Sequence, residues 1–493
     1  MIPTGRLRLL RAQGDKMQDL PLEHSYAENL VGFYAQSRPA RAPSPQLLVF
    51  NQPLAQELGL DGAALAAQGA TLFSGNDLPA NARPIALAYA GHQFGGFSPQ
   101  LGDGRALLWG EVIDRAGQRR DLAFKGSGPT PFSRGGDGFA ALGPVLREYI
   151  MGEGMHALGL PTTRVLACVS TGAKVRRETM LDGAILTRIA ISHLRVGTFQ
   201  FFAAKGERNR VRQLADYTIA RHYPKAMAAQ NRYLALFDAV ATAQVQLVAR
   251  WMSIGFIHGV MNTDNMALSG ETIDYGPCAF MEIYDPETVF SSIDRQGRYA
   301  YANQPTMMGW NLARFAETLL ELIDPDQDRA IEIATQRLEG VAQGYEVQWQ
   351  QLLGAKLGLA RADTLGVAYL DLLLDAKVDF TQGFYALRLA QKDATLLESL
   401  FAHAPQGLEI WLRDWRAALG PTSQMLMERA NPLYIARNHL VEEALAAAQS
   451  DDLAPLTALV QVLQNPYDFV VGQERYAAPA PEGFGAYRTF CGT

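Results

Sequence analysis

The hydrophobic pattern of this chain changes near residue 195, and this change constrains the fold more than any other feature of the sequence. Before it come four runs typical of β-strands, at residues 106–113, 120–125, 163–169 and 183–189. One helix is expected between the second and third runs, from Pro144 to His156. After residue 195, apolar residues recur at helical spacing, and nearly every segment from 309 to 464 is typical of an amphipathic helix. This order predicts an α+β chain with a small β-rich lobe followed by a larger helical region.

Composition restricts the class of protein. The chain has 493 residues, of which 48% are hydrophobic and 19% are charged, so it is globular and not mainly disordered, collagen-like or coiled-coil. At about 150 residues per domain, the length allows two or three domains, or one large domain with additions. The formal net charge of −6 gives no reason to expect binding to nucleic acid or to an anionic membrane.

Cysteine content and the first residues bear on the cellular compartment. Three scattered cysteines are too few for a disulfide framework and indicate a reducing environment. No apolar stretch approaches the ~18 residues that cross a membrane, and the first 20 residues lack the apolar core of a secretory signal. We therefore predict a cytoplasmic protein, with an organellar presequence as the alternative.

Glycine is concentrated in one window, which holds 12 of the 45 glycines between Gly91 and Gly138. Two segments of it, residues 102–105 and 126–138, flank the first pair of expected strands. Glycines there let backbone N–H groups approach phosphate oxygens closely. Neither segment matches the standard dinucleotide or P-loop motif, so glycine-rich hairpin turns remain the alternative. The cations that could assist phosphate binding are Arg105, Lys125 and Arg134.

Charge supports the nucleotide hypothesis. Residues 121–195 hold nine Lys or Arg against six Asp or Glu, although arginines on a solvated face would give the same count. Lys125 ends an expected strand, and Glu148 lies on the following helix. This is the layout in which protein kinases hold a phosphate-binding lysine with an ion pair.

The segment 251–266 resembles a kinase catalytic loop placed after a long helix. If Asn265 takes the place of the metal-binding asparagine, Val260 stands where the kinase pattern has its catalytic aspartate. A valine accepts no proton, and the nearest carboxylate able to act as the base is that of Asp264.

A second kinase-like element follows at Asp274-Tyr275-Gly276, which resembles the D-F-G element whose aspartate binds magnesium. Asn265 and Asp274 are therefore expected to hold a hard divalent cation through oxygen ligands. Between them we expect one tight hairpin, which turns at Ser269 and Gly270.

Taken together, the motifs are similar to those of the selenoprotein O family, and the similarity runs from about residue 25 to the C-terminus. That family has a protein-kinase-like bilobal fold and transfers AMP from ATP to Ser, Thr or Tyr hydroxyls of proteins. Its nucleotide is flipped relative to kinases, which turns the α-phosphate toward the attacking hydroxyl. The matching segments are residues 89–105, 125–138, 192–197, 258–265 and 274–277.

The resemblance implies a role for each matching residue. Glu148 would orient Lys125, Asp264 would accept the proton, and Asn265 and Asp274 would hold Mg2+ or Mn2+. The residues implied to contact the nucleotide are Gly102, Gly104, Arg105, Lys125, Asp137, Gly138, Arg188, Arg195 and Asp274.

The resemblance also implies an organisation in four parts. These are an N-terminal extension packed on the core (1–80), expected to form loops and short helices; a β-rich N-lobe with the nucleotide loops (81–195); a C-lobe with the catalytic and metal loops (196–330); and a family-specific helical region with a mobile tail (331–493). ATP and hydroxyl-bearing target proteins are the expected partners, without nucleic acid or membrane, and the chain is expected to be a monomer. An ATP-dependent kinase and a catalytically silent nucleotide-binding scaffold remain the alternatives, and UMP transfer from UTP with manganese stays open.

The cysteines depart from the family pattern. Eukaryotic members carry selenocysteine third from the C-terminus, where this chain has Cys491. Some bacterial members join a C-terminal cysteine to one in the loop after the D-Y-G element, near Phe290 here. Because Cys278 lies much closer to Asp274, free thiols are expected and a Cys278–Cys491 disulfide is the alternative.

Overall fold

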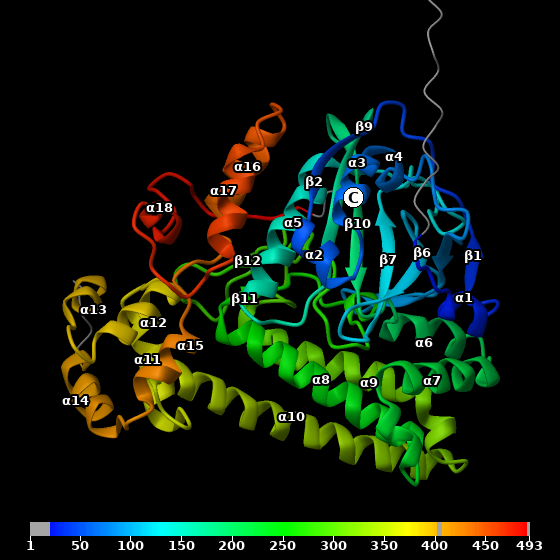
Figure 1. Cartoon of the computed structure of the whole chain (residues 1–493). Helices are drawn as coiled ribbons and strands as arrows, with labels where there is room; N and C mark the ends of the chain where they lie inside the picture. The colour runs from blue at the N-terminus through cyan, green and yellow to red at the C-terminus, as the bar shows by residue number, and fades with distance from the viewer. Residues whose placement is uncertain (1–19, 402–406, 491–493) are drawn as a thin grey trace, which may run out of the picture.

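The computed structural model describes residues 20–401 and 407–490, and within them an eight-stranded sheet lies above a layer of long helices (Figure 1). Neighbouring strands run antiparallel in the order β1-β3-β6-β7-β10-β9-β2, and β8 pairs with β10 off this path. The bounds are β1 Tyr34–Gln36, β2 Gln46–Phe50, β3 Ile85–Leu87, β6 Ala106–Ile113, β7 Arg119–Lys125, β8 Ala140–Ala141, β9 Arg164–Arg176 and β10 Met180–Ala190.

The central strands are buried on both faces, which explains their nearly continuous apolar runs. Ile185 and Leu186 are neighbours on β10 but belong to separate apolar clusters, one on each side of the sheet. One face is covered by short helices from the N-terminal segment, and the other by α5 (Leu142–Ala157). The short helices are α2 Gln52–Glu57, α3 Gly62–Ala67 and α4 Gly69–Phe73.

The four strands expected from the sequence are confirmed as β6, β7, β9 and β10. The two outer strands of the sheet, β1 and β2, were not expected, since residues 1–80 carry only loop and short-helix patterns. Both strands are short, and β1 makes its backbone pairs with β3 alone. Strands of three to five residues show too few alternations to be recognised from the sequence.

Three long helices lie side by side below the sheet: α8 (Arg232–Ser253), α9 (Gln304–Ile323) and α10 (Gln327–Leu357) (Figure 1). Asn231 begins α8 by accepting hydrogen bonds from the backbone of Tyr233 and Leu234. Smaller helices complete this layer: α1 Ser25–Asn29, α6 Val196–Ala203, α7 Arg208–His222, and the 3-10 turns η1 Pro224–Ala228 and η3 Tyr301–Asn303.

The loop between α8 and α9 contains β11 (Phe256–Ile257), the 3-10 turn η2 (Thr263–Asn265) and β12 (Ala279–Phe280). The expected hairpin at Ser269 and Gly270 is wrong, although the chain does turn there. Ala267 instead bridges to Arg195, and Thr272 bridges to Thr162. Each arm of the loop therefore finds its backbone partner in another part of the chain, and β11 pairs with β12.

Of the C-terminal helices, α11 to α15 lie at the end of α10, and α16 and α17 return to the sheet side of the molecule (Figure 1). In Figure 1, α16 and α17 lie next to α5, and the two helices pack on it. The tail crosses the loop after β12, where Thr489 bridges to Ser291. It also contacts α5, where Arg147 donates a hydrogen bond to Tyr487 at 2.9 Å. The bounds are α11 Asp363–Asp375, α12 Phe380–Leu389, α13 Thr395–Leu400, α14 Leu408–Ala418, α15 Ser423–Ala430, α16 Asn438–Ala448, α17 Ala454–Leu463 and α18 Glu474–Ala477.

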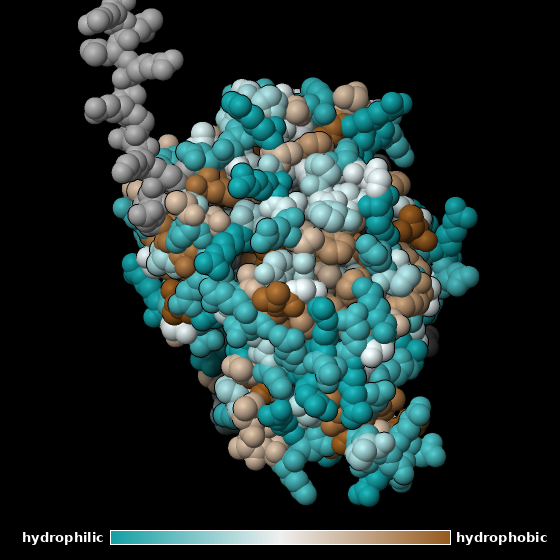
Figure 2. Space-filling view, turned by 90° about the vertical axis from the view of Figure 1, so that its right-hand side faces the viewer, coloured by the Kyte–Doolittle hydropathy of each residue, from teal (hydrophilic) through white to brown (hydrophobic). Residues whose placement is uncertain are grey.

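The surface carries few concentrated apolar areas on the face shown in Figure 2, where hydrophobic side chains are scattered among hydrophilic ones. Among the helices of residues 20–401 and 407–490, none combines the length and the apolar character needed to cross a membrane.

One lysine of the lower layer is expected to reduce stability. Lys356 is 2% exposed and lies 4.3 Å from the ring centre of Phe384, and burial lowers its pKa to about 7. Since the unfolded chain then binds this proton more tightly than the folded one, the stability of the wild type rises with pH between about 7 and 10.5. Lys356→Met should therefore raise the free energy of unfolding by about 3 kcal/mol more at pH 6.5 than at pH 9.5.

Denaturant unfolding at the two pH values measures this difference, with Lys225→Met at an exposed position as the control. A gain for Lys356→Met that is equal at both pH values would show that its ammonium group is not penalised by burial.

Candidate active site

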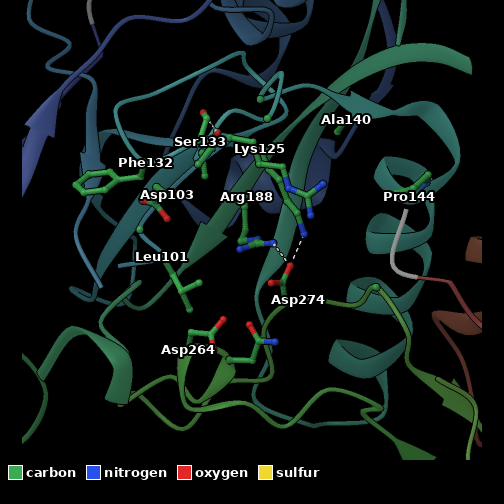
Figure 3. Close-up of a pocket in the computed structure, with 18 of the residues that line it drawn as sticks. Leu101, Asp103, Lys125, Phe132, Ser133, Ala140, Pro144, Arg188, Asp264 and Asp274 are labelled. Carbon is green, nitrogen blue, oxygen red and sulfur yellow. Dashed lines mark hydrogen bonds and ion pairs between the residues drawn. The ribbon is translucent and has the colours of Figure 1, made fainter. Parts of the chain in front are cut away.

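A cavity of about 850 Å³ opens between the sheet and the loop that joins α8 to α9. Residues from β6, β7, β10 and α5 line it from above, and residues of the loop 260–277 line it from below. Figure 3 shows Lys125 and Arg188 pointing down toward Asp274, with Asp264 below Asp274. All twelve residues predicted from the sequence as site residues line this one cavity.

Lys125 and Glu148 form the ion pair expected from the sequence. Lys125 lies at the end of β7, and its Nζ donates to Oε2 of Glu148 on α5 at 2.7 Å. Arg188 on β10 donates through Nε to the other oxygen of Glu148 at 2.6 Å. Burial opposes ionisation of Glu148, but Arg188 and Lys125 outweigh it and lower the pKa of this carboxyl. Glu148 is thus a charged anchor that holds two cations at the cavity.

Asp274 lies within reach of the same two cations. Lys125 contacts its Oδ1, and the Arg188 guanidinium donates to that oxygen at 3.3 Å. Although burial would raise the pKa of Asp274, Lys125, Arg188 and Arg105 hold it well below its usual range. Its backbone has φ of 71°, a left-handed conformation that aspartate tolerates better than most residues and that is common at functional sites.

Asp264 lies in η2 and is 7% exposed. Its Oδ2 accepts a hydrogen bond from Gln93 at 3.1 Å, whereas its buried Oδ1 has no hydrogen-bond partner among the described residues. Burial raises the pKa of Asp264 to about 6, against the opposing effect of Arg195. Asp264 lines the cavity, and a buried carboxylate with a raised pKa at such a place is a candidate proton acceptor.

The glycine-rich loops are bonded to each other above the cavity. Thr130 donates to the carbonyl of Asp103 at 2.6 Å, and Ser133 donates to the carbonyl of Gly104. The Phe132 ring fills the space next to Gly102, so a side chain at Gly102 would collide with it. Gly102 also has φ of 68°, which favours glycine. The two loops therefore form one unit. An antiparallel bridge between Ser127 and Phe139 also closes the second loop as a hairpin-like turn, and its role in phosphate binding stays a prediction.

Arg195 and Asp137 occupy different parts of this cavity. Arg195 is buried, stacks on the Tyr89 ring at 4.4 Å and donates to the backbone carbonyl of Asp264 at 2.9 Å. Asp137 lies at the exposed rim, where its carboxylate pairs with Arg177 at 2.8 Å. Arg195 thus connects the upper loops to the loop of Asp264, while Asp137 belongs to the entrance.

The donor set fits a hard divalent cation. Asn265 uses its amide nitrogen to donate to the carbonyl of Val260 at 3.0 Å. Within the described part of the chain, neither the amide oxygen of Asn265 nor Oδ2 of Asp274 accepts a hydrogen bond. No group of three or more His, Cys, Asp or Glu side chains suited to a metal occurs in residues 20–401 and 407–490. A cation here would need phosphate or water oxygens as its other ligands, as magnesium commonly does.

The sequence analysis missed several cavity residues that lie inside the motifs themselves. Asp103, between Gly102 and Gly104, is 5% exposed. Gln93 donates a hydrogen bond to Asp264, which lies 171 residues later in the sequence. No pattern in the sequence marks either of them as a site residue, because both act through contacts with distant segments.

The cysteine hypothesis concerns residues next to the cavity. Cys278 and Cys168 are buried free cysteines in the described part of the chain. Cys491 lies outside the described residues, so a Cys278–Cys491 disulfide stays a prediction.

Comparisons with known proteins cover nearly the whole chain. A family model described as "Protein adenylyltransferase SelO" matches residues 16–464. A protein of Cereibacter sphaeroides (strain KD131), named "Protein nucleotidyltransferase YdiU", is 59% identical over 477 residues, which cover 96% of this chain and 99% of the relative. Relatives of the same name from Mycobacterium sp. (strain KMS) and Rhizobium meliloti (strain 1021) are 55% and 53% identical over 484 and 485 residues. These alignments cover 97% and 96% of this chain, and 100% and 99% of the relatives.

Proposed function

Because the chain belongs to the SelO family of protein adenylyltransferases, we propose that the cavity below the sheet is its nucleotidyl-transfer site. The chain is a protein nucleotidyltransferase, with ATP as the donor and hydroxyl groups of target proteins as acceptors. We further propose a kinase-like division of labour, in which the β-rich part binds the phosphates and the helical part supplies the loop of Asp264 and Asn265.

The cation cluster supplies the electrostatic part of the mechanism. Lys125, Arg188 and Arg105 would bind the triphosphate, and Glu148 would keep Lys125 and Arg188 in place through its two charged hydrogen bonds. Glycine loops 102–105 and 126–138 would let the backbone approach the phosphate oxygens. Asn265 and Asp274 would hold Mg2+ or Mn2+, which when bound supplies further neutralisation of the phosphate charge.

Asp264 supplies the proton-transfer part. Its carboxylate would accept the proton of a Ser, Thr or Tyr hydroxyl as the hydroxyl oxygen attacks the α-phosphorus of ATP. A bond forms between the hydroxyl oxygen and the α-phosphorus, and the bond from the α-phosphorus to the oxygen that bridges it to the β-phosphorus breaks. Pyrophosphate leaves and keeps the bridging oxygen. The observation that carries this proposal is the Asp264 carboxylate, whose pKa burial raises, lining the same cavity as the Lys125–Arg188–Asp274 cluster (Figure 3).

Labelled ATP tests the reaction class. The wild type is incubated with Mg2+ and ATP that carries the label on either the α- or the γ-phosphate, with casein as an added acceptor. We expect label on protein only from the α position, and intact-mass analysis should show an increment that matches AMP. Label only from the γ position would identify a kinase, and no label on the chain or on casein would favour a silent scaffold. Parallel reactions with α-labelled UTP and Mn2+ test whether UMP is also transferred.

A further inference from the structure

The first part of the glycine-rich window forms a separate two-stranded hairpin that touches the loop of Asp264. Its strands are β4 (Gly91–Gln93) and β5 (Gly96–Ser98), and they pair only with each other among the described strands. The glycine loops that handle phosphate begin later, at Gly102. The nucleotide-binding role proposed above therefore leaves this hairpin without a function.

Consecutive residues of the hairpin bond to consecutive residues of the loop. The backbone N–H of His92 donates to Oγ1 of Thr263 at 2.7 Å, and that of Phe94 donates to Oδ1 of Asn262 at 3.1 Å. Between them, the side-chain amide of Gln93 donates to Oδ2 of Asp264 at 3.1 Å. Two backbone N–H groups of the hairpin thus hold the two residues just before Asp264, and one side chain holds Asp264 itself.

The hairpin backbone packs directly against Asp264. A Cβ placed on Gly91 would collide with Oδ1 of Asp264 and lie 2.9 Å from its Cγ, so only glycine fits there without moving the carboxylate. From the opposite side, Gln200 on α6 accepts a hydrogen bond from Thr263 at 2.6 Å and contacts Nδ1 of His92 at 2.9 Å. The hairpin and Gln200 therefore leave the Asp264 side chain little room to rotate.

The two oxygens of Asp264 are left in unequal positions. Oδ2 is occupied by the Gln93 amide, and Oδ1 is buried without a partner among residues 20–401 and 407–490. We propose that Gln93 is a positioning residue whose hydrogen bond to Oδ2 fixes the orientation in which the Asp264 carboxylate faces the acceptor hydroxyl. This inference rests on the proposed role of Asp264 as proton acceptor. It assigns the hairpin to orientation of the base, separate from binding of the phosphates.

A positioning role and a merely structural role differ in kinetics. A residue that only orients the base lowers the maximal rate of transfer and leaves ATP binding unchanged. A residue that only stabilises the loop lowers the unfolding temperature, and its loss has the same effect whether or not position 264 carries a carboxylate.

The test is a double-mutant cycle with Gln93→Leu and Asp264→Asn, measured with α-labelled ATP, Mg2+ and casein. Gln93→Leu should lower the maximal transfer rate by about 10- to 100-fold, the effect of losing a hydrogen bond to a charged group. The ATP concentration that gives half the maximal rate should stay within about threefold of the wild type. In the Asp264→Asn background, Gln93→Leu should change the residual rate by less than about twofold.

Two further variants complete the design. Gln100→Leu is the matched control, since Gln100 is exposed just beyond the hairpin, and it should transfer AMP at the wild-type rate. Gln93→Glu keeps the shape of the side chain but replaces the amide donor with a carboxylate, which repels Asp264. It should lose at least as much activity as Gln93→Leu. It therefore tests the proposal even if Gln93→Leu folds poorly.

The possible failures are distinguishable. Equal losses from Gln93→Leu in both backgrounds would overturn the role of Gln93 while leaving Asp264 as the base. A wild-type rate for Asp264→Asn alone would remove the base, and with it both the proposed mechanism and this inference.

Discussion

Replacing Asp264 by asparagine should slow AMP transfer by about 100- to 10,000-fold, the contribution typical of a positioned general base. Asparagine has nearly the same size and keeps an oxygen that can accept the hydrogen bond from Gln93. Its amide group, however, cannot take a proton from a hydroxyl. ATP binding should change little, because Lys125 and Arg188, two of the cations that would hold the triphosphate, lie on β7 and β10 and pair with Glu148 and Asp274 instead.

The rate is measured with α-labelled ATP, and ATP affinity is measured by calorimetric titration in the presence of Mg2+. Glu409→Gln, an exposed carboxylate on α14, is the control for loss of one negative charge. Transfer at the wild-type rate by Asp264→Asn would mean that the attacking hydroxyl loses its proton elsewhere.

Asp274→Asn should reduce transfer by about 1000-fold or more and should also weaken metal-dependent binding of ATP. Asp274 contacts both Lys125 and Arg188 and offers a second oxygen for a cation. Asparagine removes the negative charge that these groups share. Because asparagine also tolerates a left-handed backbone, the φ of 71° at this position is not the cause of the expected loss.

The contrast between the two variants is the decisive measurement. Calorimetric titrations with and without Mg2+ should show metal-dependent ATP affinity retained in Asp264→Asn and lost in Asp274→Asn. Asp451→Asn is a matched control, because Asp451 is exposed and also has a positive φ, of 62°. Unchanged metal dependence in Asp274→Asn would exclude this residue as the ligand.

Much of the candidate site could be predicted because its residues carry their chemistry in local motifs. Lys125 at a strand end, Glu148 on the next helix and Asp274 two residues before a glycine are each common patterns, and their order along the chain made them recognisable. Val260 stands where the kinase pattern has its catalytic aspartate, and Asp264 was predicted as the base because it is the nearest carboxylate. The structure places these side chains around one cavity. Their roles in catalysis stay predictions until the variants are measured.

The contacts between distant segments could not be predicted. The loop after η2 was expected to fold on itself, yet its arms pair with Arg195 and Thr162. Strands β1 and β2 owe their conformation to neighbours in the sheet, since three to five residues carry little pattern of their own. Local sequence does not encode which distant backbone will supply a hydrogen-bond partner.

The sequence by itself determined the alternation of strand-rich and helix-rich parts, the identity of the charged groups and the family, because periodicity and motif spacing are local properties. Only the tertiary structure decided that both glycine loops form one unit, that Glu148 holds two cations, and that Gln93 occupies one oxygen of Asp264. Those facts depend on side chains 23 to 171 residues apart meeting at hydrogen-bond distance. Packing of the whole chain is what brings them there.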